Sequence, residues 1–432
     1  MTWDLSRLIG HFLRNFYLGL NSHVIEPWIL PRVFSPARLR EAKKDQERLG
    51  TLDLGARGTN FNRIWFHAAS VGELESLWPL ISISADRGHE LIITILSESA
   101  HTALANLVLE LSGRASSLIF SGYSPWEGHW GEYLDQLKPT LLVTARYEAW
   151  PDLWMSLSQR QIPLGIIAAR DRRSLRLAEK LCRWMSQDVP QLFFFSATPG
   201  EREGLQRRFP KAQVKDLGDP RWDRVHERSQ RGNPRASALV QAAQDLPRPW
   251  GVLGSAWMAD LAFLFPGVLQ KHGTLWIVPH RVEEESVLPM EAFLMTHGVG
   301  VVKTRGLLRF EDQPQVVLVN EMGFLSELYS AADWAWVGGG FGQGIHSTLE
   351  PALQGVPIGT GPRGTSKFSE VEALSESGQL AVLSTPNDLE LWIQSAPSSQ
   401  VQNRWKEQAQ ARLGAGERIF AELNLILKKC SD

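Results

Sequence analysis

The chain has 432 residues, 43% of them hydrophobic and 21% charged, so it is long enough for two globular domains and too apolar for a disordered or collagen-like protein. Its 45 Lys and Arg residues nearly balance 47 Asp and Glu residues, and the net charge of −2 provides no global field that would hold nucleic acid. The two cysteines, Cys182 and Cys430, are too few for a disulfide framework and lack zinc-site spacing, which favours a reducing, cytoplasmic setting.

The first segment of the chain predicts an amphipathic helix. Apolar side chains recur at the spacing of one helical face, namely Leu5, Leu8, Ile9, Phe12, Leu13, Phe16, Tyr17 and Leu20. Residues 1–44 hold seven Lys or Arg against three acids, which favours contact with an anionic membrane surface. The same stripe is also typical of a helix that docks on the protein's own core. No run of about 18 apolar residues occurs, so we expect no conventional membrane-spanning helix.

Further along the chain, short runs of β-branched and aromatic residues alternate with helical stretches, which predicts parallel strands joined by crossover helices. The first series of strands is 64–67, 91–95, 118–120, 141–144, 164–168 and 192–195. The second series is 251–254, 275–278, 299–302, 316–319, 334–337 and 356–358. Gly, Pro and charged residues at 217–250 indicate a linker with one short helix, and 402–428 predicts a C-terminal helix. We therefore expect an α/β protein with two Rossmann-like domains that face each other across a cleft.

A small-residue turn, AASVGE at 68–73, follows the first strand and opens a helix. Glu73 then lies at the carboxyl end of a parallel strand, where open α/β sheets bind ligands, and is a candidate base. The alternative is structural, because Ser70 and Glu73 have the Ser-x-x-Glu spacing of a helix capping box. The sequence alone leaves both interpretations open.

The sharpest feature is a glycine-rich turn, GGGFGQGIH at 338–346, between strand 334–337 and a helix at 349–353. Glycines let the backbone approach a ligand, and a helix N-terminus offers N–H groups to phosphate. The turn has neither the GK[ST] of a Walker A loop nor the first-strand position of a dinucleotide fingerprint. It is therefore a phosphate site of another kind or a purely structural turn. His346 and Glu350, four residues apart on one helical face, favour the functional interpretation.

Eight motifs occur in the order found in one known family. They are WFHAASVGELE at 65–75, RYEAWPDL at 146–153, AARDRRS at 168–174, GDPRWDRV at 218–225, GSAWMAD at 254–260, VPH at 278–280, NEMGFLSELYSAAD at 320–333 and VGGGFGQGIHSTLEPALQGVPIGTGP at 337–362. Over about residues 50–375 the chain thus resembles the 3-deoxy-D-manno-octulosonic acid (Kdo) transferases. The resemblance implies a metal-free and cofactor-free glycosyltransferase of GT-B fold that moves Kdo from CMP-Kdo to a lipid A precursor in lipopolysaccharide biosynthesis. It also implies an N-terminal helix associated with the inner leaflet, on the cytoplasmic side of the cell inner membrane.

The resemblance also assigns roles to single residues. Glu73 corresponds to the catalytic base, which takes a proton from the acceptor hydroxyl in an inverting displacement at the anomeric carbon of Kdo. The residues implied in binding CMP-Kdo are Arg221, Ser255, His280, Met322, Gly323, Gly339, Gly340, His346, Ser347 and Glu350. Among these, the Gly339 and Gly340 N–H groups would hold the phosphate. Ser70, Glu148 and Arg170 are weaker candidates for the acceptor or the Kdo carboxylate.

The motifs and the linker give a division of the chain. Residues 1–45 are expected to form the membrane-associated amphipathic segment, 46–225 the acceptor domain, 226–248 the linker and 249–432 the donor domain. The chain departs from many relatives at Arg146, Ala256, His280 and Ser347, which bears on acceptor contacts and on how many Kdo residues are added.

Two alternatives remain from the sequence. One is a nucleotide-sugar transferase on the same scaffold with a different donor or acceptor, and the other is a catalytically silent, membrane-bound binding protein. Glu73, His346 and Glu350 argue against the silent protein, because such a protein has no chemical need for these side chains.

Overall fold

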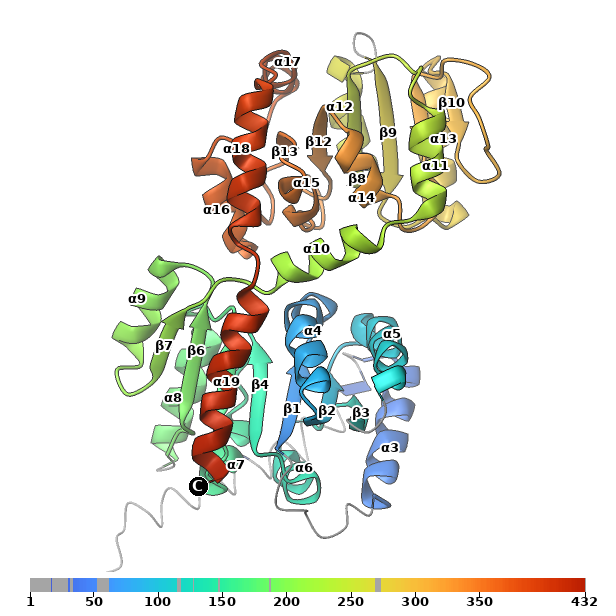
Figure 1. Ribbon diagram of the computed structural model, residues 1–432. Helices are drawn as coiled ribbons and strands as arrows, with labels where there is room; N and C mark the ends of the chain where they lie inside the picture. The colour runs from blue at the N-terminus through green and yellow to red at the C-terminus, as the bar shows by residue number, and fades with distance from the viewer. Residues whose placement is uncertain are drawn as a thin grey trace, which may run out of the picture. The chain divides into compact units, whose positions relative to one another are not determined.

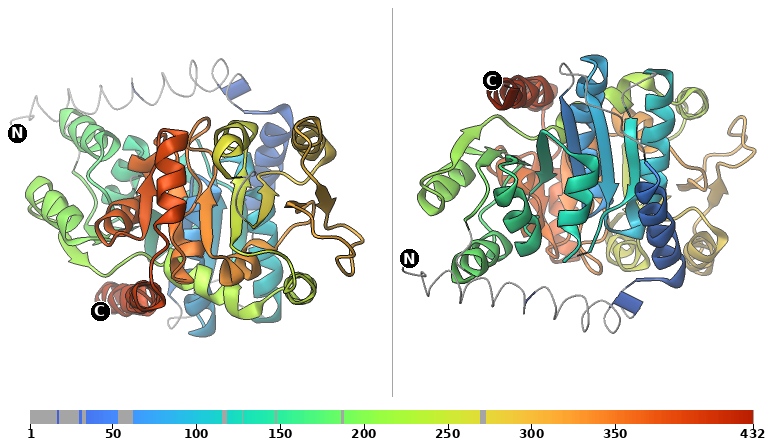
Figure 2. Two further views of the ribbon diagram at one scale, coloured as in Figure 1. Left: turned by 90° about the horizontal axis from the view of Figure 1, so that it is seen from above. Right: turned by 90° about the horizontal axis from the view of Figure 1, so that it is seen from below.

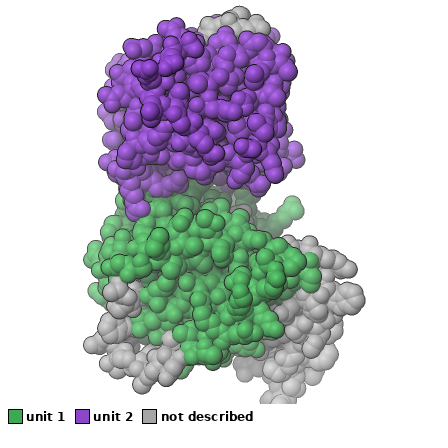
Figure 3. Space-filling view, turned by 90° about the vertical axis from the view of Figure 1, so that its right-hand side faces the viewer, with its two compact units in different colours: residues 1–224, 414–432 green, residues 225–413 purple. Residues whose placement is uncertain are grey.

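A computed structural model describes residues 17, 30–31, 34–52, 62–114, 118–126, 128–146, 148–185, 188–268 and 273–431. The chain divides into two compact units, Met1–Arg224 with Gly414–Asp432 (unit 1) and Val225–Leu413 (unit 2), shown in two colours in Figure 3. Apart from Tyr17, the predicted amphipathic helix over residues 5–20 lies outside the described residues. In the part of the chain that is described, no helix combines the length and the apolar character needed to cross a bilayer.

Unit 1 is built on a parallel sheet of seven strands in the order β3-β2-β1-β4-β5-β6-β7 (Figure 1). The strands are β1 Arg63–Ala68, β2 Glu90–Ile95, β3 Leu118–Tyr123, β4 Leu141–Ala145, β5 Leu164–Ile167, β6 Leu192–Ser196 and β7 Gln213–Asp216. The helices are α3 Pro36–Gly50, α4 Val71–Asp86, η2 Glu98–Ala100, α5 His101–Leu111, η3 Ser112–Arg114, α6 Trp130–Leu137, α7 Pro151–Gln159, α8 Arg173–Trp184, α9 Pro199–Arg208, α10 Arg221–Arg231, which continues into unit 2, and α19 Ala415–Ser431.

Helices cover both faces of this sheet, as the views of Figure 2 show. The side chains of β1 and β6 are buried throughout, which fits central parallel strands that read as continuous apolar runs. One face packs on α4, α5 and α19, and the other packs on α6, α7 and α8. The last helix, α19, contributes Ile419, Leu423 and Leu427 to the first of these cores.

Unit 2 repeats the plan with seven parallel strands in the order β10-β11-β9-β8-β12-β13-β14. The strands are β8 Trp250–Ala256, β9 Thr274–Pro279, β10 Val301–Lys303, β11 Val316–Leu318, β12 Trp334–Val337, β13 Ile358–Thr360 and β14 Leu380–Val382. The helices are α11 Pro234–Ala242, α12 Met258–Val268, α13 Glu284–Thr296, α14 Leu325–Ala331, α15 Leu349–Leu353, η4 Thr365–Lys367, α16 Ser369–Glu376, α17 Pro386–Gln394 and α18 Ser399–Gln410.

A strand of the structure overlaps each strand expected from the sequence, although β10 and β13 each begin two residues later than expected. Two strands at sheet edges, β7 and β14, were missed. The segments outside the strands differ more from what the sequence predicts. The expected linker 226–248 holds most of α10 and all of α11, and the expected helix 402–428 is two helices separated at residues 411–414. Gly414, between the two helices, has φ +81, a left-handed conformation, and the residues after it join unit 1 and not the expected donor domain.

Candidate active site

The candidate residues of each unit follow the carboxyl ends of its strands. In unit 1, Ser70 and Glu73 follow β1, Glu148 follows β4 and Arg170 follows β5. In a parallel sheet these ends share one edge, which is where open α/β folds bind ligands.

Glu73 lies in the first turn of α4 and is almost fully buried, with 4% of its surface exposed. The backbone N–H of Ala69 donates a hydrogen bond to its carboxylate at 2.6 Å. Ser70 is the N-cap residue, but its hydroxyl makes no capping hydrogen bond. The capping box allowed by the sequence is therefore only half formed, because the Glu73 carboxylate reaches back to the backbone N–H groups of Ala69 and Ser70 while the Ser70 hydroxyl caps nothing.

The surroundings of Glu73 favour its neutral form. Burial raises the pKa of Glu73 to about 8, and the neighbouring Glu148 carboxylate raises it as well, whereas the Ala69 N–H and Arg146 act in the opposite direction. Burial also raises the pKa of Glu148, against a hydrogen bond of 2.9 Å from the Trp150 indole N–H. A carboxyl group whose pKa lies close to the working pH suits general base catalysis.

Arg146 is part of this group. It follows β4 with φ +64, a left-handed backbone conformation that is costly for a residue other than glycine. Its guanidinium lies 3.9 Å from where a Cβ atom on Gly72 would be. From the sequence Arg146 is only a departure from the family pattern, whereas the structure places its positive charge beside the catalytic candidate Glu73.

Two arginines proposed from the sequence already have acidic partners in unit 1. Arg170 pairs with Glu201, with Nε 2.7 Å from Oε1. Arg221 donates from Nε to Asp219 at 2.9 Å. Burial would raise the pKa of Asp219, but Arg221 offsets this and leaves it below the usual value. Arg221 thus lies in unit 1, and the other residues expected to bind the donor lie in unit 2.

Unit 2 contains a pocket of about 490 Å³ at the carboxyl ends of β8 and β9. Half of the residues expected to bind the donor line it, namely Ser255, His280, Met322, Gly323 and Glu350. Gly339, Gly340, His346 and Ser347 are not among the lining residues, and Ser347 is exposed, with its hydroxyl accepting from the Leu349 N–H at 3.4 Å.

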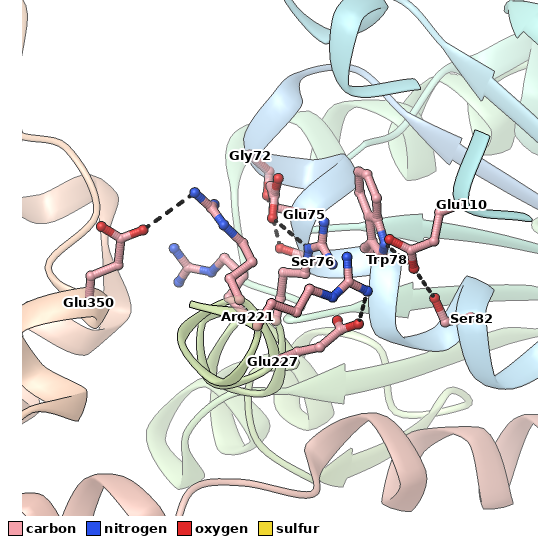
Figure 4. A network of polar contacts seen from close by, with 12 residues as sticks. Gly72, Glu75, Ser76, Trp78, Ser82, Glu110, Arg221, Glu227 and Glu350 are labelled. Carbon is pink, nitrogen blue, oxygen red and sulfur yellow. Dashed lines mark hydrogen bonds and ion pairs between the residues drawn. The ribbon is translucent and has the colours of Figure 1, made fainter. Parts of the chain in front are cut away.

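The pocket also includes residues that the sequence analysis assigned to the linker. Arg228 pairs with Glu350 at 3.7 Å (Figure 4), and Arg231 lies in the same wall. The Asn233 side chain donates to the Gly323 carbonyl at 3.0 Å and so fixes the turn that carries Met322. No motif marked these residues, since they become neighbours only when α10 and α11 fold against the strand ends.

The glycine-rich turn is held by a buried carboxylate. Asp260 accepts the Gly339 N–H at 2.8 Å and the Trp257 N–H at 3.1 Å. The Gly339 N–H is therefore directed to a protein side chain, which differs from the expectation that it binds phosphate. A Cβ atom on Gly340 would lie 2.5 Å from the Gly361 Cα. Close backbone packing thus accounts for glycine at this position.

Three aromatic rings stack beside the turn. The His280 ring lies between Trp257 and His346, with centroid distances of 4.8 and 4.4 Å and interplanar angles of 22°. The Trp257 indole N–H donates to His346 Nε2 at 3.4 Å. Burial, together with the neighbouring His280, lowers the pKa of His346 to about 4, so the ring is neutral near pH 7. Trp257 was missed from the sequence because nothing in its spacing links it to the two histidines.

The arrangement contains no evident metal centre. In the described parts of both units, no three His, Cys, Asp or Glu side chains gather as a metal ion would require.

Comparison with known proteins assigns the chain. The profile of the family described as 3-deoxy-D-manno-octulosonic-acid transferase (kdotransferase) matches residues 43–224. The 3-deoxy-D-manno-octulosonic acid transferase of Chlamydia pneumoniae is 27% identical over 344 residues, which cover 73% of this chain and 72% of that protein. The chain contains a Kdo transferase family domain at residues 43–224, and its similarity to Kdo transferases extends over most of its length. A Kdo transferase is a glycosyltransferase, so the chain is an enzyme of that class.

Solved structures agree with this fold. The UDP-GlcNAc 2-epimerase of Neisseria meningitidis aligns with a TM-score of 0.57 at 12% identity, over 85% of this chain and all of that chain. The calicheamicin glycosyltransferase CalG4 aligns with a TM-score of 0.50 at 14% identity, over 86% of this chain and all of that chain. The two parallel units thus have the GT-B architecture, which an epimerase and a glycosyltransferase share, so the fold alone does not select the reaction.

Proposed function

We propose that this chain transfers Kdo from CMP-Kdo to a lipid A precursor, with inversion at the anomeric carbon and without a metal ion or other cofactor. Similarity to the Kdo transferases supports the sugar that is transferred, because the relative from Chlamydia pneumoniae is named for Kdo transfer. The lipid A acceptor, the inversion and a position on the cytoplasmic side of the inner membrane are further parts of the proposal. The observation that carries the mechanism is the buried Glu73 carboxyl at the carboxyl end of β1.

In this proposal the unit 2 pocket binds the CMP part of the donor. Arg228 and Arg231 supply positive charge for the phosphate, and the Ser255 hydroxyl supplies a hydrogen-bond donor. Glu350 accepts hydrogen bonds from ribose hydroxyls, and the Met322–Gly323 turn contacts the cytosine. Each role uses a residue that lines the same pocket.

Glu73 acts on the acceptor. Its carboxylate takes the proton of the attacking sugar hydroxyl, the oxygen bonds to the anomeric carbon of Kdo, and the bond from that carbon to CMP breaks with CMP leaving as an anion. Burial makes this carboxylate a stronger base than an exposed one. Arg146, beside Gly72, supplies positive charge that stabilises the ionised base before reaction.

The test is transfer from freshly made CMP-Kdo to a tetra-acylated lipid A precursor, read by mass spectrometry with EDTA present. The wild type should give product whose mass increments count the Kdo residues added. Glu73→Gln, which keeps the shape of the side chain, should lower turnover by about 100-fold or more. Equal rates for the two proteins would remove Glu73 from the mechanism.

Nucleotide binding separates this proposal from its alternatives. CMP should raise the melting temperature, whereas UDP and GDP should not, because a ligand stabilises the folded state that binds it. Protection by UDP or GDP instead would indicate a transferase with another donor. If CMP raises the melting temperature but no lipid A precursor gives product, the proposed donor site is supported and the proposed acceptor is contradicted.

A further inference from the structure

The outward face of α8 is unusually basic. Its exposed positive side chains are Arg172, Arg173, Arg176, Lys180 and Arg183. The single acid within the helix, Glu179, is buried and pairs with Arg183 at 2.8 Å and with Arg208 of α9 at 3.0 Å. Asp171, just before the helix, pairs with Arg176. Five cations therefore share a face whose neighbouring carboxylates, among the described residues, are those of Asp171 and Glu179, so positive charge is in excess there.

Two large apolar side chains flank these cations. Leu177 is 57% exposed and Trp184 is 59% exposed, seven residues apart on the same side of the helix. Leu181, between them, is half-buried and continues the strip toward the core. The opposite face of α8 already has its partners, because Leu175, Ala178 and Cys182 are buried in the core that covers one side of the sheet. The exposed Leu and Trp are thus not needed to hold α8 on unit 1.

We propose that this face of α8 rests on a bilayer that contains anionic phospholipid. Cations beside an exposed Trp and aliphatic side chains are the pattern of a helix that lies in the plane of a membrane interface, with phosphates at the cations and the apolar strip at the acyl boundary. Leu177 and Leu181 favour a bilayer over nucleic acid, because aliphatic side chains do not stack on bases. The surface consists of described residues of unit 1, and the proposal does not depend on which sugar the enzyme transfers.

Contact between α8 and the bilayer can be measured with a dye attached to α8 in the full-length protein. Leu177→Cys combined with Cys430→Ser leaves the introduced thiol as the accessible site for an environment-sensitive dye, since Cys182 is fully buried. Vesicles of phosphatidylcholine with phosphatidylglycerol should increase the dye emission, shift it to the blue and protect it from an aqueous quencher. Leu109→Cys in the same background is the matched control, because Leu109 is 73% exposed on α5, which packs on the other face of the sheet. Its dye should not respond.

A charge reversal tests the electrostatic part. Arg173→Glu with Lys180→Glu should weaken binding to these vesicles by about tenfold or more, since each cation near an anionic surface adds to the affinity. Arg404→Glu with Lys406→Glu on α18 is the control for a change of the same net charge at exposed positions. Unchanged melting temperatures show that the variants fold. If the charge-reversal variant does not fold, Arg173→Gln with Lys180→Gln replaces it in the same measurement.

Three results would overturn the proposal. The first is a dye at position 177 that stays as open to the quencher on vesicle-bound protein as on free protein, which means that another segment holds the membrane. The second is an equal response to pure phosphatidylcholine vesicles, which removes the role of charge. The third is the same dye response to single-stranded RNA, with release of the protein from vesicles, which identifies the face as a nucleic-acid site.

Discussion

Replacing Glu73 by Gln tests the electrostatics of the site without any substrate. At pH below about 4.5 the carboxyl is protonated in both the folded and the unfolded chain, so the wild type and the variant should have similar stability. Between pH 4.5 and about 8 the unfolded chain releases a proton that the folded chain retains. The wild type therefore loses about 1.4 kcal/mol of unfolding free energy for each pH unit in this interval, and Glu73→Gln does not.

The size of the effect follows from the raised pKa. Part of the shift comes from Glu148, whose own ionisation becomes easier when Glu73 is removed, so we expect a gain of about 3 kcal/mol for the variant at pH 8.5. For a unit of this size that corresponds to about 6–12 °C in the melting temperature. The loss of a charge at the start of α4 costs only about 0.3–1 kcal/mol, and the Gln side-chain oxygen still accepts the Ala69 N–H.

The assay is a thermal melt of both proteins at pH 5 and at pH 8.5. Glu73→Gln should melt close to the wild type at pH 5, where the difference is only about 0.7 kcal/mol, and well above it at pH 8.5. Glu75→Gln, on the same helix, is the control, because it removes an ion pair with Arg224 at 3.3 Å and so should melt below the wild type at both pH values (Figure 4). A constant difference between Glu73→Gln and the wild type at the two pH values would show that burial does not perturb Glu73, and the argument for it as a strong base would fail.

Two further predictions concern the glycine-rich turn. Asp260→Ala leaves the Gly339 and Trp257 N–H groups without their buried acceptor, which should cost about 1–3 kcal/mol for each group and weaken thermal protection by CMP. Asp260→Asn retains an acceptor oxygen and should lose less; equal losses would mean that the hydrogen bonds do not hold the turn. Gly340→Ala should destabilise the protein by about 1–3 kcal/mol in urea unfolding, because the new methyl group meets the Gly361 backbone. Gly342→Ala, with no atom within 4 Å of the added carbon, should be close to neutral, and equal effects would contradict the packing explanation.

Local sequence patterns were sufficient to predict most strands of the two sheets. Continuous apolar runs such as LFFFS in β6 identify strands that are buried on both faces. The edge strand β7 reads QVKD and is half exposed, so neither of its faces produces an apolar run. A strand of this kind is defined by its pairing with β6, which involves residues distant in sequence. Pattern analysis therefore fails first at sheet edges.

The C-terminal helix shows a different limit. Its apolar stripe correctly predicts that Ile419, Phe420 and Leu423 are buried. An apolar stripe predicts that one face of a helix is covered, but it does not identify the element that covers it. Here α19 packs on α4 of unit 1. The turn at Gly414 allows this return, and Asp223 fixes it by accepting the Gly414 and Gly416 N–H groups at 2.6 and 2.7 Å.

The candidate site was predicted in part for a similar reason. The family motifs name Glu73 and five of the residues that line the unit 2 pocket, because each motif is contiguous in sequence. They do not give the charge environment of Glu73, which depends on Glu148 and Arg146 after another strand. Nor do they give the stack of Trp257, His280 and His346, which joins the ends of three strands.

The glycine-rich turn shows why a motif needs its three-dimensional surroundings before a role is assigned. Its glycines fit a phosphate-binding loop, but Gly339 donates to Asp260 and Gly340 packs against Gly361. A Cβ atom on Gly338 would clash with the carbonyl of Ser255, so the turn lies directly against Ser255. Ser255 has φ +51 and lines the pocket. We infer that the turn supports the strained backbone of Ser255, and that the phosphate contacts of the proposed donor site come chiefly from side chains of the pocket.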